Sequence, residues 1–361
     1  MNLELTSYLK KQSDFVAVAE LEEELKLDRE ALFTEIETLI EAGYNIEFHP
    51  YLGVKLVDIP DKLLKHEIRD ELNTRNVGRK LRIFDHVSST NEEAWRLLEH
   101  EPDLKDGTVV LAESQSRGRG RMGREWHAPA GVGLWISVIC RIALPPDKLP
   151  FLTATASLAV ANMLQQFLQL PAEIKWPNDV MVRRRKVCGV LVEARSDLKD
   201  TYVMGIGLNV NQLKGEFPEH LKGIATSLRL ERPGRKPLNR VRVLRPVLFY
   251  LDRVYQNLKK KKFERIAKAW AEFVHMGGKH VGLKFGGEPF IGTVVQVDPA
   301  EGITLKLDSG DTRLFSAEGV SRVREAPLEG GEPDIEETGV APREADPRAK
   351  GESDEPQEAQ G

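Results

Sequence analysis

Strand-like and helix-like segments alternate irregularly through the middle of the chain, and this pattern constrains the fold more than any other feature. Short apolar runs that suit strands lie at 109–112, 134–139, 187–192 and 203–208. Amphipathic stretches that suit helices lie at 91–99, 153–168, 241–258 and 263–273. A regularly wound α/β fold would repeat one strand and one helix in turn. We therefore expect an α+β fold built on a mixed sheet.

The length of the chain allows more than one domain. Its 361 residues, of which 41% are hydrophobic, suffice for one core of about 200 residues with smaller modules at both ends. We predict that the main domain spans residues 81–275. A polar connector that we expect to be helical precedes it at residues 59–80.

Residues 1–58 have the pattern of a winged helix-turn-helix. Apolar positions at helical spacing predict three short helices, the third of which begins after Asp28 as its N-cap and ends before Gly43. Two strand-like segments then flank a turn at residues 50–53, as the two strands of a wing would. This arrangement is typical of proteins that bind DNA.

Residues 276–325 predict a small separate β domain. Short alternating segments there are broken by glycine-containing turns such as Gly286-Gly287 and Ser309-Gly310, which favours a barrel of the SH3-like kind. The remaining residues, 326–361, are rich in proline, glycine and acidic side chains. We expect them to form a disordered acidic tail.

The net charge of −4 hides an uneven distribution along the chain. Residues 1–58 and residues 326–361 each carry a net charge of −8, so the part between them carries +12. A basic body favours anionic ligands or an acidic protein partner, whereas the acidic flanks disfavour nucleic acid. One hypothesis is that the tail competes with acidic acceptor domains for this body. Chance partition in an acidic proteome is the alternative.

Cysteine content and hydropathy exclude several classes of protein. Cys140 and Cys188 are the only cysteines, too few for a disulfide framework or a cysteine zinc site, and we expect both to be buried thiols. No apolar run approaches the roughly 18 residues that a membrane span requires. The N-terminus also lacks the pattern of a signal peptide. We expect a soluble cytoplasmic protein with no membrane partner.

The most informative segment runs from Gln115 to Trp126. Its glycines are Gly118, Gly120 and Gly123, and its arginines are Arg117, Arg119, Arg121 and Arg124. Glycine lets the backbone approach a ligand closely, and arginine offers forked donors suited to phosphate and carboxylate. Because neighbouring cations repel, we expect the segment to stay mobile until an anionic ligand neutralises it. By itself it is equally typical of a solvated or RNA-binding loop.

A second element combines polar groups at a predicted turn. Residues 175–179 have the sequence Lys-Trp-Pro-Asn-Asp, in which Pro177 fixes a turn that presents an amide and a carboxylate. A strand from Val187 would hold Lys186 at its mouth, where an ammonium could meet an α-phosphate and an attacking carboxylate. An ordinary hairpin is the alternative interpretation.

A third element is a strand with two glycines, Gly205 and Gly207, that ends in the amides Asn209 and Asn211. Glycines in a strand allow another backbone or a ligand to approach closely. Taken alone this signal is weak, because such glycines serve packing more often than ligand binding.

Together these motifs resemble those of the biotin protein ligases, in the longer bacterial form with an N-terminal winged helix. The matching motifs occur in the family's order: Ser89-Thr90-Asn91, Gln115 with residues 118–124 and Trp126, residues 175–179, Lys186 before Gly189, and residues 205–209. The resemblance covers residues 1–325. It implies a catalytic domain similar to class II synthetases, which activates biotin with ATP as an adenylate and transfers it to a lysine of a carrier protein.

The resemblance also implies which residues bind the two substrates. Those implied for biotin are Ser89, Thr90, Asn91, Gln115, Arg119, Gly120, Arg121 and Lys186. Those implied for ATP and the adenylate are Gly118, Arg121, Arg124, Trp126, Lys175, Asn178, Asp179 and Asn209. Lys186 and Arg121 are implied as catalytic residues, and Asp179 as a candidate ligand of Mg²⁺. Core packing explains Trp126 equally well.

Charge dictates the mechanism that such a site must perform. The carboxylate of biotin and the triphosphate of ATP repel each other, so cations must neutralise and align them for attack at the α-phosphorus. The product is a mixed anhydride that reacts with water, and a loop folded over it would protect it. We expect Mg²⁺ to be held mainly by phosphate oxygens, since this ion keeps its waters.

The N-terminal unit departs from the pattern of a DNA reader. The third predicted helix has one basic residue, Arg29, and acidic residues that we expect to be exposed at Glu30, Glu35, Glu37 and Glu41. Affinity for DNA comes mostly from lysines and arginines that neutralise phosphates. We therefore predict that operator binding, through which the family's long form represses transcription, is weak or lost. Intact repression through the few basic residues is the competing interpretation.

Three other functions remain open at this stage. They are ligation of lipoate or octanoate, biotin sensing by a repressor without ligase activity, and RNA binding through the Arg/Gly segment. The Arg/Gly segment together with residues 175–179 favours biotin, and an intact Lys186 argues against a repressor without activity. RNA binding lacks interleaved aromatic residues. The resemblance implies the carrier subunit of acetyl-CoA carboxylase as partner, and it allows a homodimer.

Overall fold

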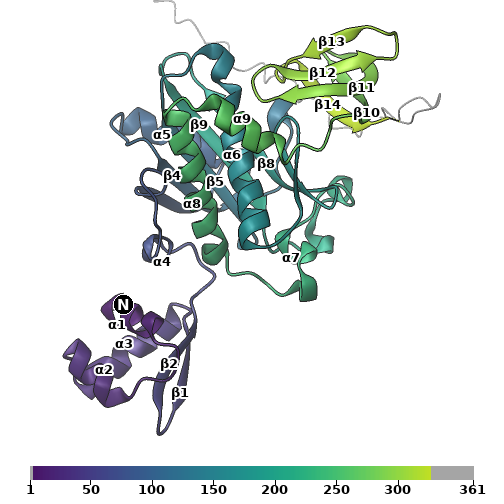
Figure 1. Ribbon diagram of the computed structural model, residues 1–361. Helices are drawn as coiled ribbons and strands as arrows, with labels where there is room; N and C mark the ends of the chain where they lie inside the picture. The colour runs from purple at the N-terminus through teal and green to yellow at the C-terminus, as the bar shows by residue number, and fades with distance from the viewer. Residues whose placement is uncertain (1–2, 327–361) are drawn as a thin grey trace, which may run out of the picture.

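The computed structural model describes residues 3–326, with the exception of the Arg322 side chain. The chain forms an N-terminal unit, a large central domain and a small C-terminal β unit (Figure 1). All but the first residue of the predicted acidic tail lies outside the described residues. Within residues 3–326, no helix is both long and apolar enough to cross a lipid bilayer.

Three helices and a two-stranded hairpin make the N-terminal unit. They are α1 (Leu3–Lys11), α2 (Val18–Leu25), α3 (Arg29–Glu41), β1 (Asn45–His49) and β2 (Gly53–Asp58). Asp28 caps α3 as predicted, because its Oδ1 atom accepts a 2.8 Å hydrogen bond from the Ala31 amide. On α3, Glu30, Glu37 and Glu41 are exposed as expected, whereas Glu35 is only half exposed.

The connector at residues 59–80 differs from the helical segment that we predicted. Only α4 (Lys65–Arg69) is helical there. Ile59, Leu63, Ile68 and Val77 along the connector are all buried. The prediction failed because the connector is mostly polar and its few apolar residues form no helical pattern. These residues pack into the core, and this packing is incompatible with one continuous helix.

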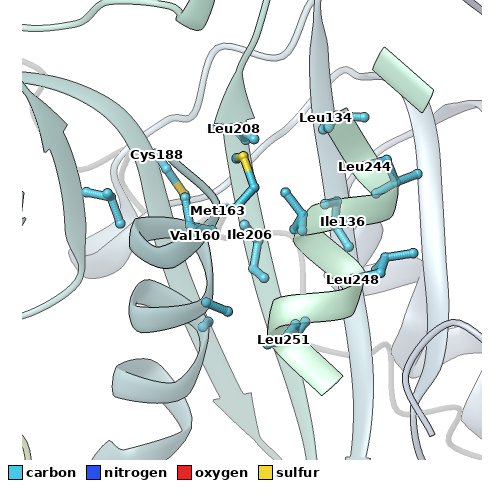
Figure 2. Packing of buried hydrophobic residues seen from close by; sticks show 14 of the residues in the cluster. Leu134, Ile136, Val160, Met163, Cys188, Ile206, Leu208, Leu244, Leu248 and Leu251 are labelled. Carbon is cyan, nitrogen blue, oxygen red and sulfur yellow. The ribbon is translucent and has the colours of Figure 1, made fainter. Parts of the chain in front are cut away.

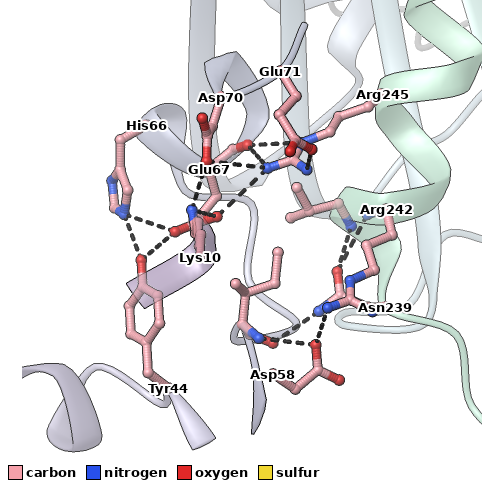
Figure 3. Close-up of polar contacts among 12 residues, drawn as sticks. Lys10, Tyr44, Asp58, His66, Glu67, Asp70, Glu71, Asn239, Arg242 and Arg245 are labelled. Carbon is pink, nitrogen blue, oxygen red and sulfur yellow. Dashed lines mark hydrogen bonds and ion pairs between the residues drawn. The ribbon is translucent and has the colours of Figure 1, made fainter. Parts of the chain in front are cut away.

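A polar cluster around Glu67 joins the N-terminal unit to the central domain. The Glu67 side chain is 0% exposed and accepts 2.5 Å hydrogen bonds from Lys10 of α1 and from the Tyr44 hydroxyl. From the other side, Arg245 of α8 (Arg240–Lys259) donates to the Glu67 backbone oxygen and lies 3.6 Å from its carboxylate (Figure 3). Burial and the neighbouring Glu67 carboxylate raise the pKa of Tyr44, so its hydroxyl stays a donor.

A seven-stranded sheet forms the centre of the molecule. Its strands are β3 (Leu81–Val87), β4 (Thr108–Gln115), β5 (Gly133–Arg141), β6 (Ala172–Lys175), β7 (Asp179–Val182), β8 (Arg185–Ala194) and β9 (Thr201–Asn209). They lie in the order β3-β4-β5-β9-β8-β7-β6. Only β3 and β4 run parallel, and all other neighbours run antiparallel. The predicted mixed sheet of an α+β fold is thereby confirmed.

Helices cover the two faces of this sheet unequally. One face packs against α6 (Pro150–Asn162) and α8, with α9 (Phe263–Ala271) beside them (Figures 1 and 2). Residues that meet in this layer include Leu134, Ile136, Ile206 and Leu208 of the sheet and Val160, Leu244, Leu248 and Leu251 of the helices. On the opposite face, α5 (Thr90–His100) packs over Val110, Ile139 and Val203. The part of that face beyond α5 carries the polar residues described below.

The C-terminal unit is a five-stranded antiparallel sheet. Its strands are β10 (His280–Phe285), β11 (Glu288–Asp298), β12 (Gly302–Leu307), β13 (Thr312–Phe315) and β14 (Val320–Glu325), in the order β13-β12-β11-β10-β14. Phe315 is fully buried and contacts the rings of Phe285 and Phe290. A small β unit was expected at this position.

Candidate active site

Small residues leave a bare strip on the sheet face that α6 and α8 do not cover. Side chains alternate between the faces of a strand, so Ser137 of β5 and Gly205 of β9, which are paired, point the same way. Gly207 of β9 is paired with Trp135 on one side and with Gly189 of β8 on the other. Since glycine has no side chain, other groups can lie directly on the strands here.

Asn91 fills the first part of this strip. A Cβ atom at Gly205 would lie 2.5 Å from Asn91 Oδ1, so only glycine leaves room for this amide. The Ser137 hydroxyl oxygen lies 2.6 Å from Asn91 Oδ1 and 2.8 Å from Thr90 Oγ1. The sequence prediction missed Ser137, although strand alternation with the glycine pattern could have indicated it.

Gln115 at the end of β4 meets the start of α5. Its Oε1 atom accepts hydrogen bonds from the Thr90 amide at 2.7 Å and the Thr90 hydroxyl at 3.1 Å. Ser89 is buried at the N-cap of α5, where its side chain makes no capping hydrogen bond. The structure therefore brings together Ser89, Thr90, Asn91 and Gln115, which come from two separate segments of the sequence.

The Arg/Gly segment closes on itself as a small hairpin. The Trp126 amide donates to the Gly118 oxygen at 2.9 Å, and the Gly120 amide donates to the Arg124 oxygen at 2.7 Å. A Cβ atom at Gly118 would lie 2.5 Å from the Trp126 oxygen, which explains the glycine. Arg119 forms ion pairs with two carboxylates, Glu92 of α5 at 3.1 Å and Glu193 of β8 at 3.2 Å.

Trp126 lies directly on the remaining glycines of the strip. A Cβ atom at Gly207 would be 2.4 Å from the indole, and one at Gly189 would be 2.8 Å from it. The ring also packs edge-on against Trp135 at 6.5 Å between centroids. Its Nε1 atom is buried without a hydrogen-bond partner among the described residues. The indole thus packs like a core residue, with one buried polar atom left unpaired.

Lys186 and Asp179 face this indole from adjacent strands. The Lys186 Nζ atom lies 2.6 Å from Asp179 Oδ1 and 5.1 Å from the centroid of the Trp126 ring. We predicted that the strand would start at Val187 and leave Lys186 at its mouth, but β8 already begins at Arg185. Burial lowers the pKa of neighbouring Lys175, and the Asp179 charge opposes that shift.

Arg121 and Arg124 reach from the Arg/Gly hairpin to the C-terminal unit. Arg121 donates to the backbone oxygens of Ala317 and Val320, the latter at 3.3 Å, and Arg124 donates to that of Ser321 at 2.5 Å. Burial lowers the pKa of Arg121. No sequence pattern indicated this contact between the Arg/Gly segment and β14.

Comparisons with known proteins bear on the family of this chain. The model of the biotin/lipoate A/B protein ligase family matches residues 83–211. The bifunctional ligase/repressor BirA of Bacillus spizizenii is 33% identical over 308 residues, which cover 85% of this chain and 94% of that protein. The chain belongs to the biotin protein ligase family. The resemblance seen in the sequence motifs is confirmed.

Other members of the biotin protein ligase family extend this likeness. A biotin–[acetyl-CoA-carboxylase] ligase of Mycobacterium tuberculosis is 36% identical over 169 residues, which cover 45% of this chain and 60% of that protein. The structure of the Aquifex aeolicus biotin protein ligase in complex with biotin and ATP aligns with a TM-score of 0.56 at 29% identity. It covers 69% of this chain and 100% of that one.

Two amides of the ligase that were predicted to touch the nucleotide are engaged within the protein. Asn178 Nδ2 donates to the Val190 oxygen at 2.8 Å. Asn209 Nδ2 donates to the Thr226 oxygen at 3.0 Å, and its Oδ1 atom accepts from Gln212 at 3.0 Å. Both side chains are thus fixed in place, with Asn209 buried at the end of β9.

The described residues of this ligase offer few side chains for metal binding or thiol chemistry. No group of three or more His, Cys, Asp or Glu side chains that could hold a metal ion occurs within residues 3–326. Cys140 and Cys188 are free, buried thiols, as predicted, and burial raises the pKa of each. A metal ion could therefore take at most one or two carboxylates, such as Asp179, and would need other ligands from a substrate.

Proposed function

We propose that this ligase joins biotin and ATP to form biotinyl-5′-AMP with release of pyrophosphate, and then transfers biotin to a lysine of a biotin carboxyl carrier protein. One observation carries the proposal: Lys186, Asp179 and Trp126 meet on a glycine-lined strip that ends at the Asn91 cluster. The names of the M. tuberculosis and Aquifex relatives support both substrates and the acceptor class.

Biotin lies at the Asn91 end of the strip in this proposal. The polar groups of Ser89, Thr90, Asn91 and Gln115 face one another there, and a ureido ring requires such a mixture of donors and acceptors. Arg119 and Gly120 close the Arg/Gly hairpin above it. Trp126 provides the apolar surface under the rest of the molecule, because its indole is already seated on the sheet.

The adenylate lies at the other end, near Lys186. The carboxylate of biotin attacks the α-phosphorus of ATP, a P–O bond forms, and pyrophosphate leaves with the electron pair of the bond that breaks. Lys186 holds its ammonium against the negative charge that develops in this step, and Arg121 assists it. Gly118, Arg124 and Lys175 bind the nucleotide. Asn178 and Asn209, whose side chains are hydrogen-bonded to the protein backbone, position the backbone groups that contact it. In the second step the acceptor lysine attacks the biotinyl carbonyl and releases AMP.

Mg²⁺ accompanies ATP in this proposal, and the donor set of the site is compatible with it. When bound, the ion would neutralise phosphate charge. Asp179 is the carboxylate that would hold it, because Asp179 Oδ1 is buried beside Lys186. A hard ion that keeps several waters and takes phosphate oxygens needs no more than this from the protein.

The N-terminal unit is a winged helix-turn-helix in this proposal, and the C-terminal unit is an SH3-like barrel. The exposed glutamates of α3 disfavour a phosphate backbone. The hairpin tip also presents Tyr51, which is 91% exposed, in place of a basic residue. Operator binding, implied by the name of the Bacillus relative, is therefore weak or lost here, and the unit serves structure, dimer regulation or a protein contact. The enzyme works in the cytoplasm.

Labelling of a carrier domain tests the proposed function. The purified chain is incubated with radiolabelled biotin or lipoate, ATP, Mg²⁺ and a biotin carboxyl carrier domain. We expect label from biotin alone, attached to the carrier lysine and absent when that lysine is replaced. Label from lipoate would establish the alternative lipoate ligase, and a protein that binds biotin without labelling the carrier would be a biotin sensor.

A further inference from the structure

The chain leaves its C-terminal sheet beside two cations, one of which lies in the turn that precedes Lys186. Glu325, at the end of β14, forms ion pairs with Arg184 at 2.5 Å and with Lys279 at 3.2 Å. Arg184 lies in the turn between β7 and β8, two residues before Lys186, and is 76% exposed. These pairs lower the pKa of Glu325, which stays ionised. The last acidic side chain of the described residues is therefore already bound to this turn.

Cations of the proposed nucleotide site lie along the same strand. Arg121 and Arg124 donate to backbone oxygens at the start of β14. Lys175 lies near the other end of this strand, because burial lowers its pKa and the charge of Arg324 adds to that shift. We call the surface made by Arg121, Arg124, Lys175, Arg184, Lys186 and Lys279 the cationic rim. β14 thus runs along the rim, and the residues that follow it start there.

The sequence that follows matches this rim in charge and in length. Residues 327–361 hold 11 acidic and 3 basic side chains. Glu329 comes four residues after Glu325, within about 14 Å even if the chain is fully extended. The 35 residues could span on the order of 100 Å, so several carboxylates can reach the rim at once.

We propose that residues 327–361 dock on the cationic rim and compete there with the triphosphate of ATP. Carboxylates and phosphate oxygens take the same forked arginine donors, so the two cannot occupy them together. A tethered segment has an effective concentration on the order of millimolar. Weak individual ion pairs then suffice for partial occupancy, and cellular ATP can displace the segment. The adenylation activity would therefore depend on ionic strength and on the ATP concentration.

Adenylation by the full chain and by a chain ending at Ala326 tests the proposal. This inference rests on the proposed function, so both proteins are assayed by biotin-dependent pyrophosphate release. At low salt, we expect truncation to lower the KM for ATP about two- to five-fold without changing kcat, as partial occupancy by a tethered competitor requires. Salt near 0.3 M should abolish the difference, since it screens these charges. An unchanged KM at low salt would overturn the proposal.

Charge rather than length must account for the effect. A full-length control in which Glu329, Glu332, Asp334, Glu336 and Glu337 become Gln or Asn should behave like the truncated chain. If it behaves like the unaltered protein, the tail acts by another route and the proposal fails.

Direct binding separates this inference from the proposed function. A fluorescent peptide of residues 327–361 is titrated with the truncated chain, and anisotropy is measured with and without ATP. We expect binding that ATP reverses and that Arg184→Ala weakens. Binding without any adenylation would refute the proposed function but keep the docking site. Adenylation without peptide binding, even at millimolar peptide, would refute the docking site but keep the proposed function.

Discussion

Lys186 on β8 and Asp179 on β7 form an ion pair of 2.6 Å at the point where the two strands lose regular register. The irregularity between Val180 and Met181 turns Lys186 toward the glycine strip instead of the helical layer. The Lys186 side chain is 26% exposed, and its ammonium lies over Trp126. A partly buried cation that already has a carboxylate partner is preorganised to meet the charge of a reacting phosphate.

Replacement of Lys186 by alanine should abolish most of the adenylation activity. We expect kcat for biotin-dependent pyrophosphate release to fall on the order of 100-fold or more, the usual loss when one preorganised donor is removed. The exposed Lys199, at the far end of the β8–β9 hairpin, provides the control. Near-normal pyrophosphate release by Lys186→Ala would remove Lys186 from its proposed role.

Gly205→Ala should weaken biotin binding more than it weakens folding. The new Cβ atom would lie 2.5 Å from Asn91 Oδ1 and would displace the amide. A displaced amide would leave a buried polar group of biotin unpaired, which costs about 1–3 kcal/mol, so we expect the Kd for biotin to rise roughly 10- to 100-fold. Gly215→Ala is the matched control, because nothing lies within 4 Å of a Cβ atom there. Calorimetric titration that finds equal affinities in both variants would contradict this use of the glycine.

The Arg/Gly segment should be protected from trypsin when substrates bind. Arg117, Arg119 and Arg124 are exposed, so trypsin should cleave the chain there in the absence of ligand. Biotin with ATP should slow the cleavage at least several-fold, because the proposed adenylate neutralises and covers the hairpin. Mass spectrometry of the fragments measures the rate at each arginine. Equal rates with and without substrates would mean that the segment does not close over them.

Glu67→Gln should destabilise the contact between the N-terminal unit and the central domain. The change leaves Lys10 and Arg245 without their buried counter-charge, which typically costs about 3–5 kcal/mol. Glu71→Gln is the control, since its carboxylate pairs with the same Arg245 but is largely exposed and should cost less than about 1 kcal/mol. Denaturant unfolding monitored separately for each unit measures both effects.

Protonation of His66 in the same cluster gives a pH dependence. Burial lowers the pKa of His66 below its usual value. The unfolded chain therefore binds this proton at a higher pH than the folded one, and stability is lost as the pH falls below about 6.5. We expect His66→Asn to flatten this part of the profile. An unchanged slope between pH 7 and pH 5 would show that other groups dominate.

The prediction of most elements from sequence succeeded because local patterns determine them. Periodic apolar residues located α5, α8 and α9, and continuous apolar runs located β4, β5, β8 and β9. The strand β3 was not foreseen, and the hairpin of β6 and β7, with four residues in each strand, was considered only as the alternative interpretation of residues 175–179. In the connector, four scattered apolar residues decide the conformation through contacts that are distant in sequence.

The candidate site was foreseen as a set of residues but not as an arrangement. Motif order identified Asn91, Gln115 and Lys186, yet nothing in the sequence pairs Asn91 with Gly205 or seats Trp126 on Gly207. These contacts depend on strand register, which side-chain patterns of single segments do not determine. The contact of Arg121 and Arg124 with β14 was likewise unforeseen. The partners lie almost 200 positions apart in the sequence, and the acceptors are backbone oxygens, which every residue has.

DNA binding should be weak despite the proposed winged-helix arrangement of the N-terminal unit. The exposed side chains of α3 include Glu30, Glu37 and Glu41 against Arg29, so the phosphate backbone meets repulsion. We expect a Kd for the protein's own upstream region no tighter than about 10⁻⁶ M in the presence of biotin and ATP, the range of non-specific binding. Nanomolar binding in a gel-shift assay would contradict this prediction and support a repressor function.

Formation of the adenylate in the absence of any carrier tests the central claim most directly. The purified chain is mixed with biotin, Mg²⁺ and α-labelled ATP, and bound nucleotide is analysed after a single turnover. We predict one equivalent of biotinyl-5′-AMP per active site, formed with biotin, absent with lipoate, and missing in Lys186→Ala. A chain that binds both substrates but never accumulates this intermediate would contradict the account.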